Sequence, residues 1–248
     1  YIEKNEVDEI AEKDMKEKSN KIIFIDNKDE ENHKVICKIG EGSTSNVFKV
    51  IDERTGLVMC KKVIKPNSNE NSFKLMKTSL KEIEVLLLIH DPCICKGIGI
   101  NIQEEMANEI KAKETDSDEE SESESNDKNT TIALFFEYLP FSLKKMIDEG
   151  IISNTLKVRI AIEIAFGISH IHRLGLMHRD LKLENIMLND IFESKIIDFG
   201  LVHVPELSGT GCSLTKGVGT LAFMSPEMTN EEEYDNKTDV YSFGVVLH

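Results

Sequence analysis

Residues 177–185 read MHRDLKLEN, and the tripeptide DFG follows at 198–200, thirteen residues after Asn185. The two stretches supply two carboxylates, a carboxamide, a lysine and an arginine. Mostly apolar runs at 186–188 and 195–197 lead out of the first stretch and into the second, and they indicate short strands. Carboxylate and carboxamide oxygens are ligands that Mg²⁺ accepts, and lysine and arginine neutralise phosphate charge. The pattern therefore predicts a site for a magnesium nucleotide on two neighbouring loops.

H-R-D-x-x-x-x-N followed by D-F-G resembles the catalytic core of the eukaryotic protein kinases. A lone H-R-D tripeptide recurs by chance, so the resemblance depends on the presence of both motifs. The resemblance implies an α+β, bilobal fold, with an antiparallel sheet and one helix in the N-lobe and mainly helices in the C-lobe. It covers residues 34–248, with the N-lobe at 34–138 and a partial C-lobe at 141–248.

The same resemblance assigns chemical roles to the two loops. Asp180 is expected to accept or orient the proton of the substrate hydroxyl, and Lys182 to neutralise charge on the transferred γ-phosphoryl group. Asn185 and Asp198 are expected to hold Mg²⁺ through hard oxygen ligands. His178 resembles part of an internal apolar stack, so we expect a core histidine and neither an acid nor a base.

A glycine-rich stretch, GEGSTSNV at 40–47, follows period-two alternation from Lys34 and indicates strand, turn, strand. Taken alone, it would indicate an ordinary hairpin. In the resembled family this loop covers the nucleotide. Ser45 replaces the third glycine of the family pattern, so we expect a less pliable loop whose backbone N–H groups can still face phosphates. The residues expected to line the ATP site here are Ile39, Gly40, Gly42 and Val47.

Lys61 and Lys62 are both candidates for the lysine that reaches the α- and β-phosphates in the family. Their spacing from the preceding turn and from Val47 selects Lys62. Residues two apart in a strand share a face, so Cys60 should face the same way as Lys62. In the resembled family a small residue at this position covers the adenine, and Cys60 is expected to take its place. Lys61 should point to the other face.

A helix is predicted at 73–90, with apolar residues on one stripe and a stop at Asp91 and Pro92. In the resembled family this helix carries a glutamate that pairs with the strand lysine, and the count back from Pro92 selects Glu82. Glu84 is the weaker candidate, because residues two apart do not share a helix face.

The run TIALFFEYLP at 131–140 indicates a buried strand that ends in what resembles the hinge of a kinase. Phe136 is expected to be a bulky gatekeeper at the back of the adenine pocket. Backbone groups of Glu137 to Leu139 are expected to hydrogen-bond the base, and Met187 to contact the nucleotide. Asn154 or Thr155 is expected to cap a long, largely buried helix that runs to about residue 173.

The formal net charge of −15 is uneven along the 248 residues. Residues 1–33 and 103–130 carry −5 and −8 of it, which leaves the remainder nearly neutral. We expect 1–33 to be a charged leader, helical or disordered apart from a short strand at 21–25. We expect 103–130 to be a disordered acidic insertion between two strands. The charge argues against binding nucleic acid or an anionic membrane surface.

The cysteine pattern and the hydropathy bear on the cellular compartment. The five cysteines are an odd set without metal-ligand spacing beyond one C-x-C, so we expect reduced thiols and no zinc site. No apolar run approaches the roughly 18 residues that a membrane span needs. The chain begins at Tyr1 and not at Met. We expect a cytoplasmic kinase domain, or the cytosolic part of a membrane protein whose span lies upstream.

The segment after DFG bears on specificity and regulation. Lys182 with Gly219 and Thr220 resembles serine/threonine kinases, and TDVYSFG at 238–244 resembles the tyrosine-kinase-like group. Asp239 is there expected to brace the catalytic loop. An upstream kinase is expected to phosphorylate the loop between the two motifs, where the phosphate would pair with Arg179. The candidate hydroxyls are those of Ser208, Thr210, Ser213 and Thr215.

We expect Mg²⁺-dependent transfer of the γ-phosphoryl group of ATP to Ser or Thr of a protein, in a signalling role. Dual or tyrosine specificity is one rival. A catalytically weak scaffold is another, motivated by Ser45, Cys60 and the end of the resemblance inside a helix. We expect a C-terminally truncated domain in which Glu227 lacks its usual arginine partner. Such a fragment should be unstable or inactive, although its parent protein should be active.

Overall fold

The computed structural model describes residues 25–26, 31–42, 45–64, 82, 85–86, 89–105, 129–202 and 219–248. They fall into two compact units. The sheet unit comprises the described residues of Ile23–Leu80 and Ile98–Phe136, and the helical unit comprises those of Lys81–Gly97 and Glu137–His248.

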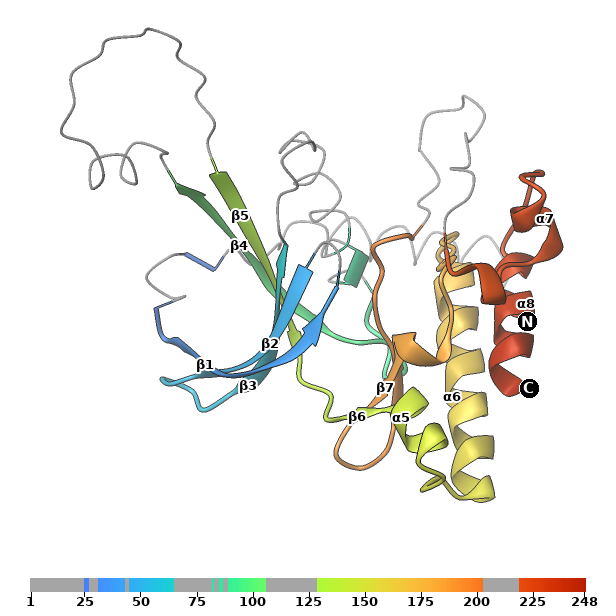
Figure 1. Cartoon of the computed structure of the whole chain (residues 1–248), viewed down its shortest axis with the longest axis horizontal. Coiled ribbons are helices and arrows are strands. Elements are labelled where there is room, and N and C mark those ends of the chain that lie inside the picture. Colours follow the sequence, from blue (N-terminus) through green and yellow to red (C-terminus); the bar gives the residue numbers. More distant parts are fainter. Residues whose placement is uncertain are drawn as a thin grey trace, which may run out of the picture. The chain divides into compact units, whose positions relative to one another are not determined.

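The sheet unit is built on five strands in the order β1-β2-β3-β5-β4 (Figure 1). Their bounds are β1 His33–Glu41, β2 Ser45–Asp52, β3 Val58–Ile64, β4 Gly97–Glu105 and β5 Asn129–Glu137. β2 pairs antiparallel with both β1 and β3. The antiparallel sheet predicted for the N-lobe is confirmed.

The turn between β2 and β3 fixes the register of these strands. The Asp52 carboxylate accepts hydrogen bonds from the Arg54 amide and the Thr55 hydroxyl, both at 2.9 Å. Gly56 follows with φ of 72°, a conformation that suits glycine. The hydrogen bonds from Arg54 and Thr55 hold the pKa of Asp52 below its usual range.

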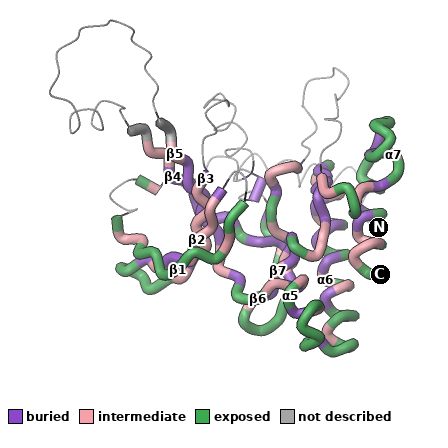
Figure 2. The backbone as a smooth tube through the Cα atoms, in the orientation of Figure 1, coloured by how far each residue is buried: buried purple, intermediate pink, exposed green. Residues whose placement is uncertain are grey.

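One face of the sheet carries a core of Val50, Met59, Ala133 and Phe135. Figure 2 shows β1 as largely exposed and the middle of β5 as buried. Ile25 packs against this core, its amide donates to Ile100 O at 2.8 Å, and its carbonyl accepts from Asn101 Nδ2 at 2.8 Å. The sheet unit therefore includes Ile25, which the sequence placed in the leader.

Three sequence expectations border on residues that the structure does not describe. β4 reaches Glu105 and β5 begins at Asn129, so the strands extend into the predicted insertion, and 106–128 lie outside the described residues, as do 1–24. In the predicted helix at 73–90, Glu82 and residues 85–86 are helical, whereas residues 89–90 are not. That helix ends earlier than predicted.

The helical unit contains a three-stranded sheet in the order β6-β7-β8, of which Figure 1 labels β6 and β7. The strands are β6 Phe141–Ser142, β7 Ile186–Leu188 and β8 Ser194–Ile196. The helices are α5 Leu143–Asp148, α6 Asn154–Arg173, α7 Pro226–Thr229 and α8 Lys237–Leu247, with 3-10 turns at Leu183–Asn185 and Leu221–Phe223. The two strands predicted between the catalytic loop and DFG, at 186–188 and 195–197, are thus present as β7 and β8.

α6 differs from its prediction in two ways. Its cap is Ser153, whose Oγ accepts from the Leu156 amide at 3.2 Å, and neither Asn154 nor Thr155. A single face is buried, so the expectation of a largely buried helix was wrong. Val158, Ile162 and Phe166 lie on the exposed side, with Phe166 66% exposed.

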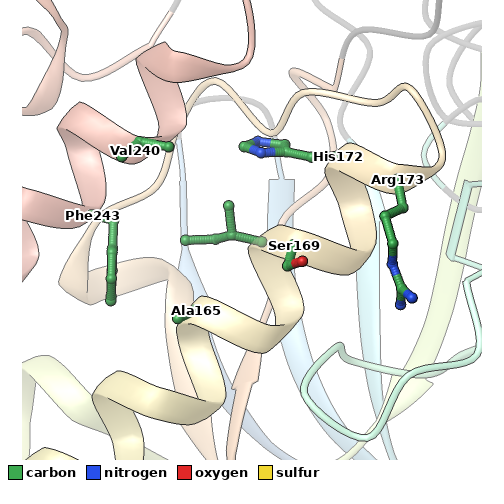
Figure 3. A pocket seen from close by; sticks show the side chains of 7 residues that line it. Ala165, Ser169, His172, Arg173, Val240 and Phe243 are labelled. Carbon is green, nitrogen blue, oxygen red and sulfur yellow. The ribbon is translucent and has the colours of Figure 1, made fainter.

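A cavity of about 470 Å³ lies between α6 and α8 (Figure 3). Ala165 and Ile168 of α6 and Val240 and Phe243 of α8 form much of its apolar lining. No residue predicted for the nucleotide or metal site lines it.

Within the described part of the chain, no helix combines the length and apolarity that a membrane crossing requires. Among the described cysteines, which are Cys37, Cys60, Cys93 and Cys95, there is no disulfide bond, and Cys212 lies outside the described residues.

Candidate active site

Asp239 anchors the catalytic loop. It lies in the first turn of α8 and is fully buried. Its two carboxylate oxygens accept the amides of His178 at 2.9 Å and Arg179 at 2.8 Å. His172 Nε2 lies 2.8 Å from Asp239 Oδ2. These contacts fix the two backbone amides that immediately precede Asp180. Asp239 therefore braces the catalytic loop, as the sequence predicted.

Two opposing effects act on the Asp239 carboxyl. Burial raises its pKa, whereas the hydrogen bonds from His172 and from the amides of Arg179 and His178 lower it. The net result is a pKa below the usual range. Asp239 is therefore a buried carboxylate that remains ionised at neutral pH.

Asp180 lies at the centre of a network that engages both of its carboxylate oxygens. Oδ2 is 2.6 Å from Lys182 Nζ and accepts from Asn185 Nδ2 at 3.0 Å. Oδ1 accepts from the amide of Thr220 at 2.9 Å and from its hydroxyl at 2.7 Å. Lys182 Nζ also donates to Thr220 Oγ1 at 2.8 Å. The network orients the buried Asp180 carboxylate and connects it to Thr220, which lies forty positions later in the sequence.

Gly219 brings Thr220 to this network. Its φ is 114°, and a Cβ built on it would lie 2.6 Å from the carbonyl oxygen of Arg179. Real Cβ atoms do not approach a backbone oxygen so closely. The backbone of the catalytic loop thus passes directly over Gly219, which leaves room for glycine alone.

We predict that Gly219→Ala lowers kcat by about 10²-fold, because the clash displaces Thr220 from Asp180. Steady-state phosphoryl transfer would measure this. Gly150→Ala is the matched control, since Gly150 also has a positive φ of 67° but nothing within 4 Å of its Cβ position. Its expected cost is about 1 kcal/mol of stability with an unchanged kcat. An unchanged kcat in Gly219→Ala would contradict the assignment.

Asn185 and Asp198, the residues predicted to hold Mg²⁺, belong to the catalytic loop and to DFG. The Asn185 amide group donates to the Asp180 backbone oxygen at 2.7 Å as well as to its carboxylate, so the carboxamide oxygen is turned away from Asp180. Ile197 N donates to Asn185 O at 2.9 Å, which links the strand leading to Asp198 with the catalytic loop. Asp198 is exposed and has φ of 64°. An amide oxygen and a carboxylate, completed by nucleotide phosphates and water, fit Mg²⁺.

His178 is buried in the way the sequence predicted. Its ring packs edge-on against Phe199, with centroids 5.0 Å apart. Nδ1 accepts from the Asp180 amide at 3.3 Å, which assigns the proton to Nε2, 3.1 Å from Ile197 O. Both ring nitrogens therefore serve structure, and His178 ties DFG to the catalytic loop.

The sheet unit aligns the residues predicted to face the phosphates. Gly40 is the register partner of Val47, and Val47 is the partner of Lys62, so the three form one row across β1, β2 and β3. A Cβ on Gly40 would lie 3.3 Å from Val47 Cβ. Lys61 lies over the Phe135 ring, 5.8 Å from its centroid, on the face opposite to Lys62.

Cys60 shares the face of Lys62 by strand parity. Burial raises the pKa of the Cys60 thiol to about 11, an effect that the nearby Lys62 charge only partly offsets. Cys60 is therefore a neutral thiol at physiological pH, as a residue that packs against a base would be.

The structure groups the predicted nucleotide and catalytic residues within each unit. Ile39, Gly40, Gly42, Val47, Cys60, Lys62 and Phe136 belong to the sheet unit, and Glu82, Glu137, Leu139, Met187 and the residues of the two loops belong to the helical unit. Glu82 is buried, and its Oε2 lies 3.7 Å from the Cβ position of Gly200. The pairing of Lys62 with Glu82, and the convergence of both groups on one nucleotide, stay predictions.

Sequence reasoning missed two residues that hold the catalytic loop. His172 contacts Asp239, and the Tyr234 hydroxyl accepts from Arg179 Nη1 at 3.2 Å. Arg179 Nε donates to Leu201 O at 2.7 Å. Neither His172 nor Tyr234 stands in a pattern that signals such a contact, because both partners are distant in the sequence. The four hydroxyls predicted for phosphorylation lie in 203–218, outside the described residues.

Comparisons with known proteins agree with this geometry. The family model described as the protein kinase domain matches residues 33–248. Dual specificity testis-specific protein kinase 2 of Homo sapiens is 28% identical over 216 residues, which cover 85% of this chain and 32% of that protein. A probable serine/threonine-protein kinase of Dictyostelium discoideum is 29% identical over 217 residues, covering 86% of this chain and 20% of that protein.

Serine/threonine/tyrosine-protein kinase HT1 of Arabidopsis thaliana is 44% identical over 91 residues, which cover 36% of this chain and 22% of that protein. The chain spans about a third or less of the length of these three relatives. The family match, by contrast, includes every element from β1 to α8. With its catalytic loop, DFG and brace in place, the chain belongs to the protein kinase domain family.

Proposed function

We propose that the full-length protein, through this kinase domain, transfers the γ-phosphoryl group of Mg·ATP to serine and threonine hydroxyls of proteins. The observation that carries the proposal is the contact of Thr220 with both Asp180 and Lys182. Through these contacts Thr220, in the segment that resembles serine/threonine kinases, is hydrogen-bonded to two catalytic residues. Asp180 is expected to orient the substrate hydroxyl, and Lys182 is expected to neutralise the γ-phosphoryl group.

The residues of the helical unit divide the work as follows. Asp180 receives or orients the proton of the attacking hydroxyl, and Lys182 compensates the charge of the transferred group. Asn185 and Asp198 would hold the magnesium ion, which supplies neutralisation of the phosphate charge when it is bound. Asp239 and Gly219 fix the positions of these groups before substrate arrives.

Dual specificity is the second candidate. Two relatives carry the words dual specificity and serine/threonine/tyrosine in their names. Lys182, Gly219 and Thr220 favour serine and threonine as acceptors, because they resemble the corresponding residues of serine/threonine kinases. A kinase-like scaffold is disfavoured, because Asp180, Lys182, Asn185 and Asp198 are all present.

A peptide panel tests the proposal. The full-length protein is given radiolabelled Mg·ATP and matched peptides that differ in one acceptor residue, Ser, Thr or Tyr. We expect incorporation on Ser and Thr and at least about tenfold less on Tyr, a difference of about 1.4 kcal/mol in transition-state binding. Comparable incorporation on Tyr would establish dual specificity instead.

We also propose a cytoplasmic signalling role, with activation by an upstream kinase at the segment between DFG and Gly219. The odd number of cysteines in the sequence, without the spacing of a metal site or a disulfide framework, supports a reducing compartment.

A further inference from the structure

Glu137, the last residue of β5, is tied to its surroundings by side chain and backbone. Its amide donates to Lys96 O at 3.0 Å, and its Oε1 accepts from the Lys96 amide at 2.7 Å. The same Oε1 lies 3.0 Å from Lys195 Nζ. Both charged side chains are mostly removed from solvent, with exposed fractions of 13% for Lys195 and 27% for Glu137.

Lys195 stands where three segments meet. In the β7–β8 ladder it is the register partner of Met187, and Met187 is the partner of Ser142 in β6. The next residue, Ile196, exchanges hydrogen bonds with the 93–95 segment, at 2.8 Å from its amide to Cys93 O and 2.9 Å from the Cys95 amide to its oxygen. Asp198 follows two positions later.

We propose that Lys195 is a positioning residue for nucleotide binding, which acts by holding Glu137 through its carboxylate. This inference rests on the proposed function, in which the backbone from Glu137 to Leu139 hydrogen-bonds the adenine. The Lys195 ammonium group thereby fixes the position of that backbone relative to β7 and β8. β7 carries Met187, and β8 leads to Asp198.

The burial of the pair explains why its loss should matter. An exposed ion pair contributes little, because water and salt screen it. A mostly desolvated carboxylate that loses its cation seeks further exposure to water, which would draw the Glu137 side chain away from the Lys96 amide. Such a movement would displace the neighbouring backbone groups that face the base.

The test is a double-mutant cycle on the full-length protein, with Lys195→Met and Glu137→Gln. The Gln side chain keeps an oxygen for the Lys96 amide and removes only the charge. We measure the Kd for Mg·ADP, the KM for ATP and for a peptide substrate, and the unfolding midpoint. Lys144→Met is the matched control, because Lys144 pairs with Asp148 on the exposed side of α5.

We expect Lys195→Met to raise the Kd for Mg·ADP and the KM for ATP by about tenfold, with the peptide KM unchanged. In the Glu137→Gln background the same change should add less than about twofold, because the partner charge is already gone. Lys144→Met should change none of these values.

A purely structural role predicts a lower unfolding midpoint with an unchanged Kd, and that result would overturn the inference, as would effects that multiply in the double variant. The proposed function fails separately: a wild-type protein that binds Mg·ADP in a Lys195-dependent way but transfers no phosphate would refute it and leave Lys195 in its role. A wild-type protein that binds no nucleotide would refute both.

Discussion

Asp180→Asn is expected to lower kcat for phosphoryl transfer by about 10²- to 10⁴-fold with little change in the KM for ATP. A carboxamide cannot receive the proton of the attacking hydroxyl. It also fits the network poorly, because both oxygens of Asp180 accept hydrogen bonds, and an NH₂ group at either position would face a donor from Thr220 or from Lys182 and Asn185.

Single-turnover transfer from radiolabelled ATP measures this effect without interference from product release. Asp148→Asn is a suitable control, since Asp148 contacts Lys144 on the surface of α5 and no residue of the network. A kcat within about tenfold of wild type in Asp180→Asn would remove Asp180 from the chemistry.

The second large effect concerns stability. Asp239→Asn is expected to lower the free energy of unfolding by about 3–5 kcal/mol. The NH₂ group of the new side chain would then face the backbone amide of either His178 or Arg179, so one donor would lose its acceptor. Asp239, His178 and Arg179 are all buried, so water cannot replace that acceptor. Urea unfolding at pH 7 measures the loss. Asp235→Asn, at an exposed carboxylate just before α8, should cost less than about 1 kcal/mol.

The sign of the pH dependence follows from the lowered pKa of Asp239. A carboxyl group whose folded-state pKa is below its unfolded value stabilises the protein above the unfolded pKa of about 3.9. That contribution disappears as pH falls through the folded-state pKa. Wild type should therefore lose stability more steeply than Asp239→Asn as the pH is lowered below about 4. Parallel unfolding curves for the two proteins would show that Asp239 has no such role.

The resemblance of the motifs to protein kinases predicted much of the fold, because those motifs imply the strands and loops that carry them. The H-R-D-x-x-x-x-N and DFG stretches came with the strands between them, and spacing from the turn and from Val47, with which strand parity agrees, selected Lys62 over Lys61. The cap of α6 was misplaced by one or two residues, since Ser153, Asn154 and Thr155 are all good capping residues and the backbone geometry decides among them. The exposed side of α6 was missed because its apolar residues run around the helix.

The missed contacts are those between residues distant in the sequence. Thr220 reaches Asp180 across forty positions, Lys195 reaches Glu137 across 58, and His172 reaches Asp239 across 67. A single sequence contains no signal for such pairs, because each residue alone resembles an ordinary solvated charge or hydroxyl. The structure supplies them, and they are the contacts that fix the catalytic groups in place.

The most direct test of the account is transfer of radiolabel from Mg·ATP to a generic basic protein by the full-length protein, with phosphoamino acid analysis of the product. The account predicts Mg²⁺-dependent label on serine and threonine that is abolished by EDTA and reduced at least about 10²-fold in Asp180→Asn. Binding of Mg·ATP without any transfer would contradict it and would establish the scaffold instead.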